Sequence, residues 1–460
     1  MRIWIDATRH DDSLEIFGMT CLERVLRTVL ESQKQLRGLQ ALEEELRGLS
    51  EARSWIRNFV GRRLAVSEVR IELASDGTIP ESIPHELLHK LPVVFAQGQA
   101  TVRDRLSEAL RDADGEPLLA LSADTVVDVR AVGHLIWSSE PVAFMAGTGG
   151  EAGAILRLDG PLAPERREET DDLLGIAESC LTAGALKELN PDEFDGYIRK
   201  LRRTQAPWLF RVRNENDAAK TAHFLFWSNY KGATDFLTRY VFPPLVWRAV
   251  GPLAERRISP NLVTSVGILC CFAAVPFFAA GWWIPGLVLA YAMAVLDSVD
   301  GKLARVTFSS SKQGDVLDHG TDYVHPPIWY WAWAWGLSGG DPYSAVFQAS
   351  IWMAGLYILD RVLETLFKSC TGGRSVQDYT PLDTRLRTFV SRRNVNLAIF
   401  TVALPFGLGV EAFYAVVGLQ LATVVYHLVR VIQFWDADEQ TSSPTALPAP
   451  DTSQPMEPSS

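Results

Sequence analysis

Six long apolar stretches in the second half of this 460-residue chain limit what it can fold into. A helix of about 20 residues crosses the ~30 Å hydrocarbon core of a bilayer. Because no water is available in that core, the backbone must satisfy its own hydrogen bonds, which favours helices. The sequence therefore predicts an all-α domain of six transmembrane helices at 258–437. The helices are expected at 260–280, 282–305, 316–337, 343–367, 394–411 and 412–435.

The lysine and arginine residues between these stretches predict the orientation of the domain. The turns after the first, third and fifth stretches contain no Lys or Arg, whereas the connections on the other side are rich in both. Basic residues gather on the cytoplasmic side of a membrane. We therefore expect a multi-pass protein of the inner or plasma membrane, with both termini in the cytoplasm.

Three further segments complete the predicted organisation. Residues 1–222 alternate strand-like and helix-like runs, which is typical of a soluble α/β domain. Residues 223–257 combine aromatic residues with arginines and are interpreted as a linker and an amphipathic helix in the membrane interface. Residues 438–460, rich in Pro, Ser and Thr, are expected to be a disordered tail. The strands of the α/β domain are expected at 3–6, 93–96, 118–121, 142–146 and 154–158.

Net charge and cysteine content argue against other classes of protein. The formal net charge of −11 argues against a nucleic-acid partner, because such proteins usually carry a basic excess. The five cysteines have neither metal-ligand nor disulfide-framework spacing.

The most informative residues are the carboxylates around the connection between the second and third stretches. Asp297 and Asp300 are three residues apart and share one face of a helix. On the next stretch Gly314, Asp318 and Asp322 follow at intervals of four, again on one face. The short connection makes the two helices antiparallel neighbours. We therefore expect the four carboxylates to meet.

Four carboxylates near a membrane interior repel one another and need compensation. Lys302 and Arg305 are too few to neutralise them. A purely oxygen ligand set suits a hard divalent cation such as Mg²⁺ or Mn²⁺, either singly or as a pair of ions. The alternative is a salt-bridged helix pair or a solvated loop without a metal.

The spacing of these residues resembles the signature of the CDP-alcohol phosphotransferase family, also called CDP-alcohol phosphatidyltransferases. The six apolar stretches and the amphipathic segment before them are also similar to that family. The matching positions are Asp297, Asp300, Gly301, Ala304, Arg305, Gly314, Asp318 and Asp322.

The resemblance implies a role for each position. Asp297, Asp300, Asp318 and Asp322 would ligate two Mg²⁺ or Mn²⁺ ions, and Asp322 would take the proton from the acceptor hydroxyl. The acceptor oxygen would then attack the β-phosphorus of a CDP-linked donor, and CMP would leave. The residues expected to bind CDP are Asn261, Thr264, Asp300, Gly301, Ala304, Arg305 and Gly314.

Basic residues near the fourth and fifth stretches are candidates for binding a phosphate on the acceptor. Arg361 lies within the fourth stretch, where an arginine usually has a specific partner such as Asp360 beside it. Arg392 and Arg393 precede the fifth stretch; they could bind phosphate or meet anionic lipid headgroups. Residues 381–400, with 260–322, resemble the inositol-phosphate-using branch of the family.

The N-terminal part resembles a MobA-like sugar-nucleotidyltransferase domain. The segment LLALSADTVVD resembles its metal-binding strand end, at Asp124, and Asp217 would lie near a second metal position. Such an enzyme needs a Gly-rich loop after the first strand to approach the triphosphate, but residues 6–12 contain no glycine and three aspartates. We therefore expect a degenerate domain that scaffolds or dimerises; the alternative is an active cytidylyltransferase.

These observations favour a membrane transferase that uses two substrates. The donor is expected to be CDP-diacylglycerol or a CDP-inositol-like compound, and the acceptor a polyol phosphate or a lipid alcohol. Many members of the family are dimers, so we expect a homodimer in contact with membrane lipids. Alternatives from other classes are a divalent-cation transporter and a non-catalytic membrane anchor for the α/β domain.

Overall fold

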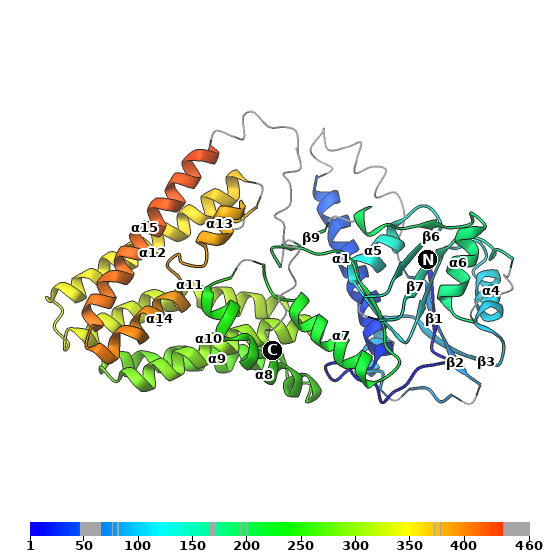
Figure 1. The fold of residues 1–460 in the computed structure, drawn as a ribbon, viewed down its shortest axis with the longest axis horizontal. Helices are drawn as coiled ribbons and strands as arrows, with labels where there is room; N and C mark the ends of the chain where they lie inside the picture. Colours follow the sequence, from blue (N-terminus) through cyan, green and yellow to red (C-terminus); the bar gives the residue numbers. More distant parts are fainter. Residues whose placement is uncertain are drawn as a thin grey trace. The chain divides into compact units, whose positions relative to one another are not determined.

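The chain forms two compact units in a computed structural model (Figure 1). The structure describes residues 1–435 except 47–65, 76, 81, 149, 165–170, 194–195, 199–200, 233, 372 and 378. One unit comprises residues 1–196 and 205–228, and the other comprises 197–204 and the chain from 229 onward. The predicted tail at 438–460 lies outside the described residues. The order expected from the sequence, a mixed α/β region followed by a helical region, is confirmed.

The α/β unit is built on a seven-stranded sheet. Its order is β3-β2-β1-β4-β7-β6-β8; the first four strands are parallel, and β7 runs antiparallel to both of its neighbours. The strands are β1 Arg2–Asp6, β2 Glu68–Ala74, β3 Val93–Gly98, β4 Leu118–Ser122, β6 Val142–Ala146, β7 Gly153–Leu158 and β8 Lys187–Glu188. A two-stranded ladder pairs β5 (Thr125–Val127) with β11 (Leu209–Arg211).

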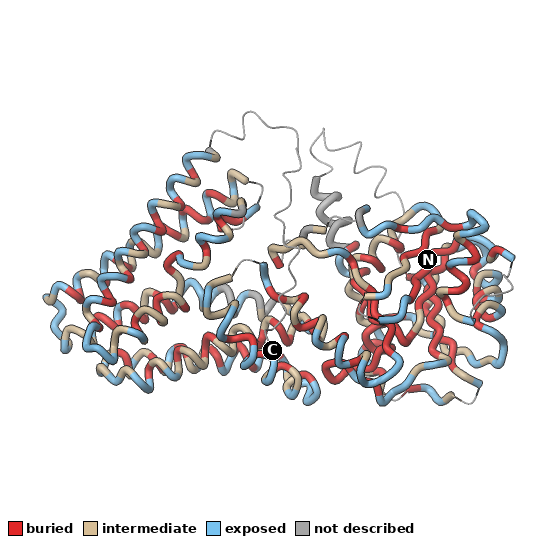
Figure 2. Tube along the Cα trace, in the orientation of Figure 1, coloured by how far each residue is buried: buried red, intermediate tan, exposed pale blue. Residues whose placement is uncertain are grey.

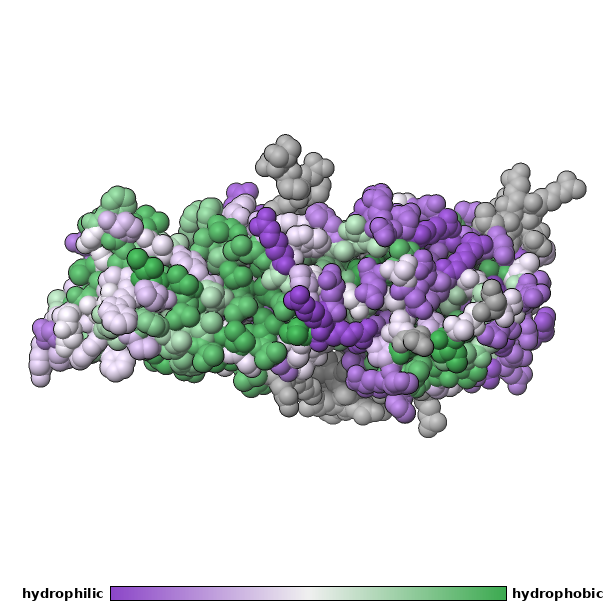
Figure 3. Space-filling view, turned by 90° about the horizontal axis from the view of Figure 1, so that it is seen from below, coloured by the Kyte–Doolittle hydropathy of each residue, from purple (hydrophilic) through white to green (hydrophobic). Residues whose placement is uncertain are grey.

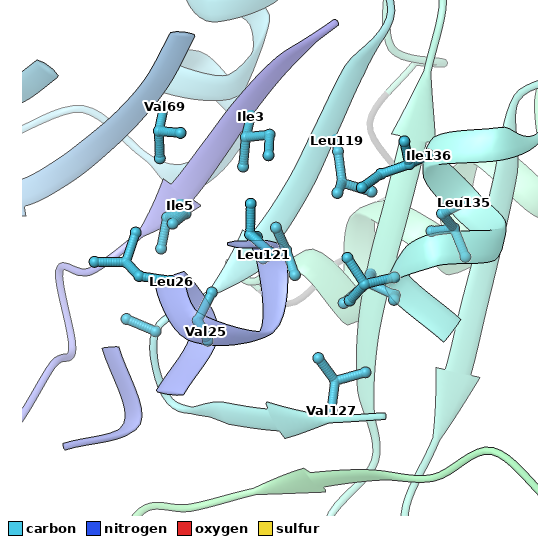
Figure 4. Close-up of a cluster of buried hydrophobic side chains, with 14 of the residues drawn as sticks. Ile3, Ile5, Val25, Leu26, Val69, Leu119, Leu121, Val127, Leu135 and Ile136 are labelled. Carbon is cyan, nitrogen blue, oxygen red and sulfur yellow. The ribbon is translucent and has the colours of Figure 1, made fainter. Parts of the chain in front are cut away.

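Helices cover both faces of this sheet. Successive side chains of a strand point to opposite faces, so the apolar residues of β1 contribute to two separate cores. Ile3 and Ile5 of β1 pack with α1 (Cys21–Leu46) and α5 (Val129–Trp137), and Figure 4 shows these side chains pointing toward one another. Trp4 lies in a second core with α4 (Val102–Asp112) and α6 (Leu173–Thr182). The unit also contains α3 (His85–Lys90), η1 (Pro191–Glu193) and α7 (Glu215–Ser228).

The second unit is helical apart from one small hairpin. Strands β9 (Tyr197–Ile198) and β10 (Arg203–Thr204) form that hairpin, and Gly232 donates its backbone N–H to Leu201 of the connecting turn over 2.8 Å. The helices are η2 Leu237–Val241, α8 Pro243–Glu255, α9 Pro260–Ala279, α10 Trp283–Val306, α11 Lys312–Leu337, α12 Ala345–Cys370, α13 Pro381–Leu386, α14 Arg393–Ala403, η3 Leu404–Phe406 and α15 Gly409–Trp435.

Four helices of the described chain are long and apolar enough to cross a membrane. They are Pro260–Ala279, Trp283–Val306, Ala345–Cys370 and Gly409–Phe434. Only a third of each apolar window is buried, and large apolar side chains such as Leu269, Ile284 and Trp352 are well exposed. Figure 2 shows this mixture of buried and exposed residues along the helices, and Figure 3 shows hydrophobic residues gathered on the surface of this unit. The protein is therefore an integral membrane protein, with hydrocarbon as the solvent of these faces.

Two of the six predicted spans differ from these helices. The stretch predicted at 316–337 lies on α11, whose first half is rich in charged residues. The stretch predicted at 394–411 contains only the 11-residue helix α14 and the short η3, after which Gly407 adopts a φ of 71°. A helix of that length rises about 16 Å, roughly half of the hydrocarbon core. The other four predicted spans coincide with the four apolar helices.

Candidate active site

Three carboxylates from two neighbouring helices line one small cavity. Asp297 and Asp300 come from α10 and Asp322 comes from α11. Asp318 lies on α11 one turn before Asp322, but its side chain is outside the described part of the structure. Residues of α9 complete the wall of the cavity, namely Thr264, Gly267 and Ile268. The helical spacing thus brings Asp297, Asp300 and Asp322 to one place, as predicted.

Small residues let the three helices come close at this point. Gly267 of α9 faces Leu296, where an added Cβ would lie 3.6 Å from the leucine side chain. At Gly314 an added Cβ would lie only 2.7 Å from Oδ1 of Asn261, so α11 begins directly against the start of α9. Ser311 caps α11 by accepting from the backbone N–H of Gly314 at 3.0 Å, and its hydroxyl donates to Asn261. Two of the residues predicted to bind CDP, Asn261 and Gly314, therefore adjoin each other.

Asp300 is the most deeply buried of the three carboxylates at this cavity. Its side chain accepts a hydrogen bond from the hydroxyl of Thr264 at 2.5 Å, and the residue is 6% exposed. Among the described residues no cation lies within ion-pairing distance of it. A buried carboxylate with one hydroxyl partner needs positive charge for compensation.

Asp297 and Asp322 face each other with a guanidinium between them. Arg393, the first residue of α14, donates through Nη2 to Asp297 at 2.8 Å and through Nη1 to Asp322 at 3.1 Å. The three residues come from three different helices, so this one side chain links α10, α11 and α14.

The carboxylates fit a divalent cation in their chemistry. Hard cations prefer oxygen ligands, and carboxylates on facing helices can supply them from two sides. Among the described side chains, which do not include that of Asp318, no three His, Cys, Asp or Glu residues are grouped closely enough to hold an ion. Arg393 lies between Asp297 and Asp322. The donor set thus suits Mg²⁺ or Mn²⁺.

A larger cavity of about 280 Å³ adjoins the carboxylates and is strongly basic. Asp297 and Asp322 line both cavities. The wall of the larger one carries seven basic side chains against three aspartates, which makes it suited to an anion. The basic residues are Lys231, Lys302, Arg305, Arg361, Arg387, Arg392 and Arg393, and the third aspartate is Asp235.

All three residues predicted to hold an acceptor phosphate reach this cavity. Arg361 is held by Asp360 at 2.5 Å and by Glu364 at 2.6 Å, so the ion pair expected with Asp360 is present. Arg392 donates to Oε1 of the buried Gln377. Arg393 reaches the cavity from its position between the carboxylates.

Two of the remaining predicted CDP residues lie at the same cavity. Gly301 lines the cavity close to Arg305, because an added Cβ would lie 3.2 Å from the Arg305 guanidinium. Ala304 is partly buried and lines neither cavity. Gly301 and Arg305 thus line the larger cavity and Thr264 lines the small one, whereas Asn261 and Gly314 adjoin each other at the starts of α9 and α11.

Sequence reasoning missed the place of Lys302 in the wall of the basic cavity. Lys302 is 2% exposed and its ammonium lies 3.1 Å from the ring centroid of Tyr230, a close cation–π contact. Arg387 donates to the same Gln377 oxygen as Arg392, at 2.5 Å. The position of Lys302 two residues after Asp300 was the one signal in the sequence that could have placed it near the carboxylates. The ring that Lys302 contacts, Tyr230, lies far away in sequence, so spacing could not reveal this contact.

A separate pocket in the α/β unit lies between residues that follow β1 and residues that follow β4. Its walls include Arg9, His10, Asp11 and Asp124. The carboxylate of Asp124 accepts from the Ser122 hydroxyl at 2.6 Å and from Nε of Arg211 at 3.0 Å, so a guanidinium already neutralises it.

Neighbouring groups of this pocket have structural partners. Asp217 accepts from the backbone N–H of Arg213 at the start of α7. Burial raises the pKa of the Cys21 thiol, which lines the pocket, to about 12, so it stays protonated at neutral pH.

The helical unit is similar in sequence to known proteins. Residues 257–426 match the family model for CDP-alcohol phosphatidyltransferases. This part of the chain is a CDP-alcohol phosphatidyltransferase domain. The match includes the carboxylates of α10 and α11, the basic residues of α12 and the start of α14.

Relatives of the CDP-alcohol phosphatidyltransferase domain are similar over shorter stretches. The inner membrane protein YnjF of Escherichia coli K12 is 34% identical over 91 residues, which are 19% of this chain and 44% of that protein. The archaetidylinositol phosphate synthase of Methanothermobacter thermautotrophicus is 34% identical over 88 residues, 19% of this chain and 45% of the synthase. This chain thus spans less than half the length of these relatives.

One solved structure is also similar to the chain. It is the crystal structure of Mycobacterium tuberculosis phosphatidylinositol phosphate synthase with CDP-DAG bound, at 18% identity and a TM-score of 0.31, covering 45% of this chain and 97% of the other. A score this low does not establish a shared arrangement.

Proposed function

We propose that this protein is a membrane CDP-alcohol phosphotransferase. It transfers a phosphoalcohol group from a CDP-linked donor to an alcohol and releases CMP. The observation that carries the proposal is that Asp297, Asp300 and Asp322 share one cavity, which opens beside a strongly basic one. The family match over 257–426 assigns the class of reaction.

The proposed metal ligands are Asp297, Asp300, Asp318 and Asp322, holding two Mg²⁺ or Mn²⁺ ions. When bound, the ions would offset the negative charge of the donor pyrophosphate. The buried position of Asp300 and its hydrogen bond from Thr264 support a fixed ligand on this side. Asp322 is about half exposed, which leaves it accessible to the acceptor as well.

The proposed reaction begins with the acceptor hydroxyl beside Asp322. Asp322 takes the hydroxyl proton while the oxygen forms a bond to the donor β-phosphorus. The bond between this phosphorus and the bridging oxygen breaks, and CMP leaves with that oxygen. On the donor side, Asn261, Thr264, Asp300, Gly301, Ala304, Arg305 and Gly314 would hold CDP.

We infer that the acceptor, or the alcohol of the donor, carries a phosphate. The seven basic side chains of the larger cavity, against three aspartates in its wall, support this inference. Arg361, Arg392 and Arg393 are the proposed phosphate ligands. A polyol phosphate, such as an inositol phosphate, matches this chemistry, and one relative is named an archaetidylinositol phosphate synthase.

We further propose six membrane crossings with both termini in the cytoplasm. Helix α11, and α14 with η3, would supply the two crossings beyond the four apolar helices. The turns at 280–282, 338–344 and 404–408 contain no Lys or Arg, which supports this orientation. Alkaline phosphatase fused after Gly339 should be active, and the same enzyme fused after Ser310 should be inactive. Activity at Ser310 would contradict the orientation.

For the α/β unit we propose a degenerate nucleotidyltransferase-like domain that scaffolds the protein or a homodimer. The ion pair between Asp124 and Arg211 supports this, because it places a guanidinium at the predicted metal position. Residues 7–12, directly after β1, contain no glycine.

The decisive experiment measures CMP release by the purified full-length protein. The assay contains Mn²⁺ or Mg²⁺, CDP-diacylglycerol or CDP-inositol, and inositol phosphate or another polyol acceptor. CMP release that requires both donor and acceptor supports the proposal. Absence of CMP from every pair, together with metal uptake into sealed vesicles, would favour a divalent-cation transporter instead.

A further inference from the structure

Arg393 bridges two of the carboxylates that are proposed to bind a metal. Its two terminal nitrogens contact oxygens of Asp297 and Asp322, at 2.8 and 3.1 Å. These are the two carboxylates that line both the small cavity and the basic one. The guanidinium therefore supplies positive charge at the boundary between the two cavities.

A guanidinium and a divalent ion compete for the same carboxylate pair. The planar fork of arginine can bridge two carboxylates and offset part of their repulsion. A bound ion would contact carboxylate oxygens at about 2.0–2.6 Å, and its charge would repel a guanidinium held at hydrogen-bonding distance from the same oxygens.

The basic cavity beside Arg393 offers its side chain a second position. It projects from the first residue of α14 and lines the basic cavity. Its other contacts are weak: Nη1 lies 3.2 Å from the Met293 sulfur, and Nε lies 3.3 Å from Oδ1 of Asn394. A rotation of its side chain would carry the guanidinium away from the carboxylates and into the cavity without movement of the helix.

We propose that Arg393 is the counter-ion of the metal-free carboxylates and moves into the basic cavity when a divalent ion binds. This inference rests on the proposed metal centre. It makes Arg393 a positioning residue that couples the two cavities: metal binding frees one more cation for an anionic substrate. By thermodynamic linkage, an anion in the basic cavity must then favour metal binding to the same extent.

The test measures Mn²⁺ affinity of the full-length protein without substrates, from the electron spin resonance signal of free Mn²⁺. Arg393→Gln removes the competing charge and should bind Mn²⁺ about tenfold more tightly than the wild type, because the ion no longer displaces a guanidinium that is paired with both carboxylates. Arg392→Gln is the matched control, because Arg392 is the neighbouring residue and donates to Gln377 instead. Its Mn²⁺ affinity should change much less.

A second measurement follows the released side chain. Glycerol 3-phosphate binding is measured by calorimetry with and without Mn²⁺. In the wild type, Mn²⁺ should strengthen this binding more than in Arg393→Gln. Arg392→Gln should bind glycerol 3-phosphate more weakly without Mn²⁺, but Mn²⁺ should strengthen its binding as much as in the wild type. An equal Mn²⁺ effect in wild type and Arg393→Gln would overturn the coupling.

The outcomes separate this inference from the proposed function. Equal or weaker Mn²⁺ binding by folded Arg393→Gln would show that Arg393 does not compete, while the metal centre would stand. Absence of Mn²⁺ binding by every variant would overturn the metal centre and the inference with it. If Arg393→Gln does not fold, Arg393→Lys replaces it, since one ammonium cannot reproduce the bidentate bridge and should also tighten Mn²⁺ binding.

Discussion

Thr264 of α9 donates its hydroxyl to the buried carboxylate of Asp300 on α10, over 2.5 Å. The same hydroxyl lies 3.1 Å from the carbonyl of Pro260, one turn earlier on its own helix. Thr264 therefore fixes the rotamer of Asp300 from the helix on which the predicted nucleotide site begins. A residue outside the carboxylate set thus holds one of its members in place.

Thr264→Val should weaken the site while it preserves the shape of the side chain. Loss of a hydrogen bond to a buried carboxylate costs about 1–3 kcal/mol, so Mn²⁺ affinity and kcat for CMP release should both fall. Thr264→Ser is the control and should retain both, because it keeps the hydroxyl. Equal behaviour of the two variants would rule out this hydrogen bond as the cause.

Asp322→Asn should separate proton transfer from metal binding. If Asp322 is the base, kcat for CMP release should fall by about 10²–10⁴. Mn²⁺ affinity should fall less than in Asp297→Asn, which removes only a ligand. Rapid-quench measurements of CMP on both variants, at saturating Mn²⁺, provide the comparison. Near-normal turnover of Asp322→Asn would exclude it as the base.

Gly314→Ala should disturb the contact between the starts of α9 and α11. The new Cβ would lie 2.7 Å from Asn261, closer than real contacts allow, and overpacking of this kind costs about 1–3 kcal/mol. Gly320→Ala is a matched control on the same helix, because its Cβ would meet nothing within 4 Å among the described atoms. Thermal unfolding in detergent should show a lower Tm only for Gly314→Ala. A similar Tm for both variants would mean that Asn261 of α9 moves aside without loss of stability.

The α/β unit should not make a CDP-alcohol from CTP. With Asp124 already paired to Arg211, incubation of the full-length protein with CTP, inositol phosphate and Mg²⁺ should give no pyrophosphate. Asp124→Asn serves as the blank, since it lacks the only carboxylate at the predicted strand end. Pyrophosphate formed by the wild type above this blank would establish an active cytidylyltransferase and contradict the proposed degeneracy.

Much of the α/β unit followed from local patterns, but not all of it. The strands expected at 3–6, 93–96, 118–121, 142–146 and 154–158 correspond to β1, β3, β4, β6 and β7. Strand β2 was missed even though its residues alternate between charged and apolar. Its Glu72 is 1% exposed and pairs with Arg70 at 2.6 Å, so a charge that looked exposed in the sequence is buried.

The candidate site was predictable where helical spacing decides the geometry. Intervals of three and four residues placed Asp297, Asp300 and Asp322 correctly at one cavity. The bridge from Arg393 joins residues 96 and 71 positions apart, and no periodicity encodes such a contact. The length of α14 was overestimated because its apolar composition continues through Pro405 and Gly407, which end the helix.

The hairpin at 197–204 determines how the chain can be divided. It belongs to the helical unit, although the segments before and after it belong to the α/β unit. The polypeptide therefore passes between the units three times, after residues 196, 204 and 228. No single cut yields both units whole: a fragment ending at 196 lacks β11 and α7, and one beginning at 229 lacks the hairpin that packs on Gly232. The two units are interleaved along the sequence, so a gene-level exchange of either one requires three junctions.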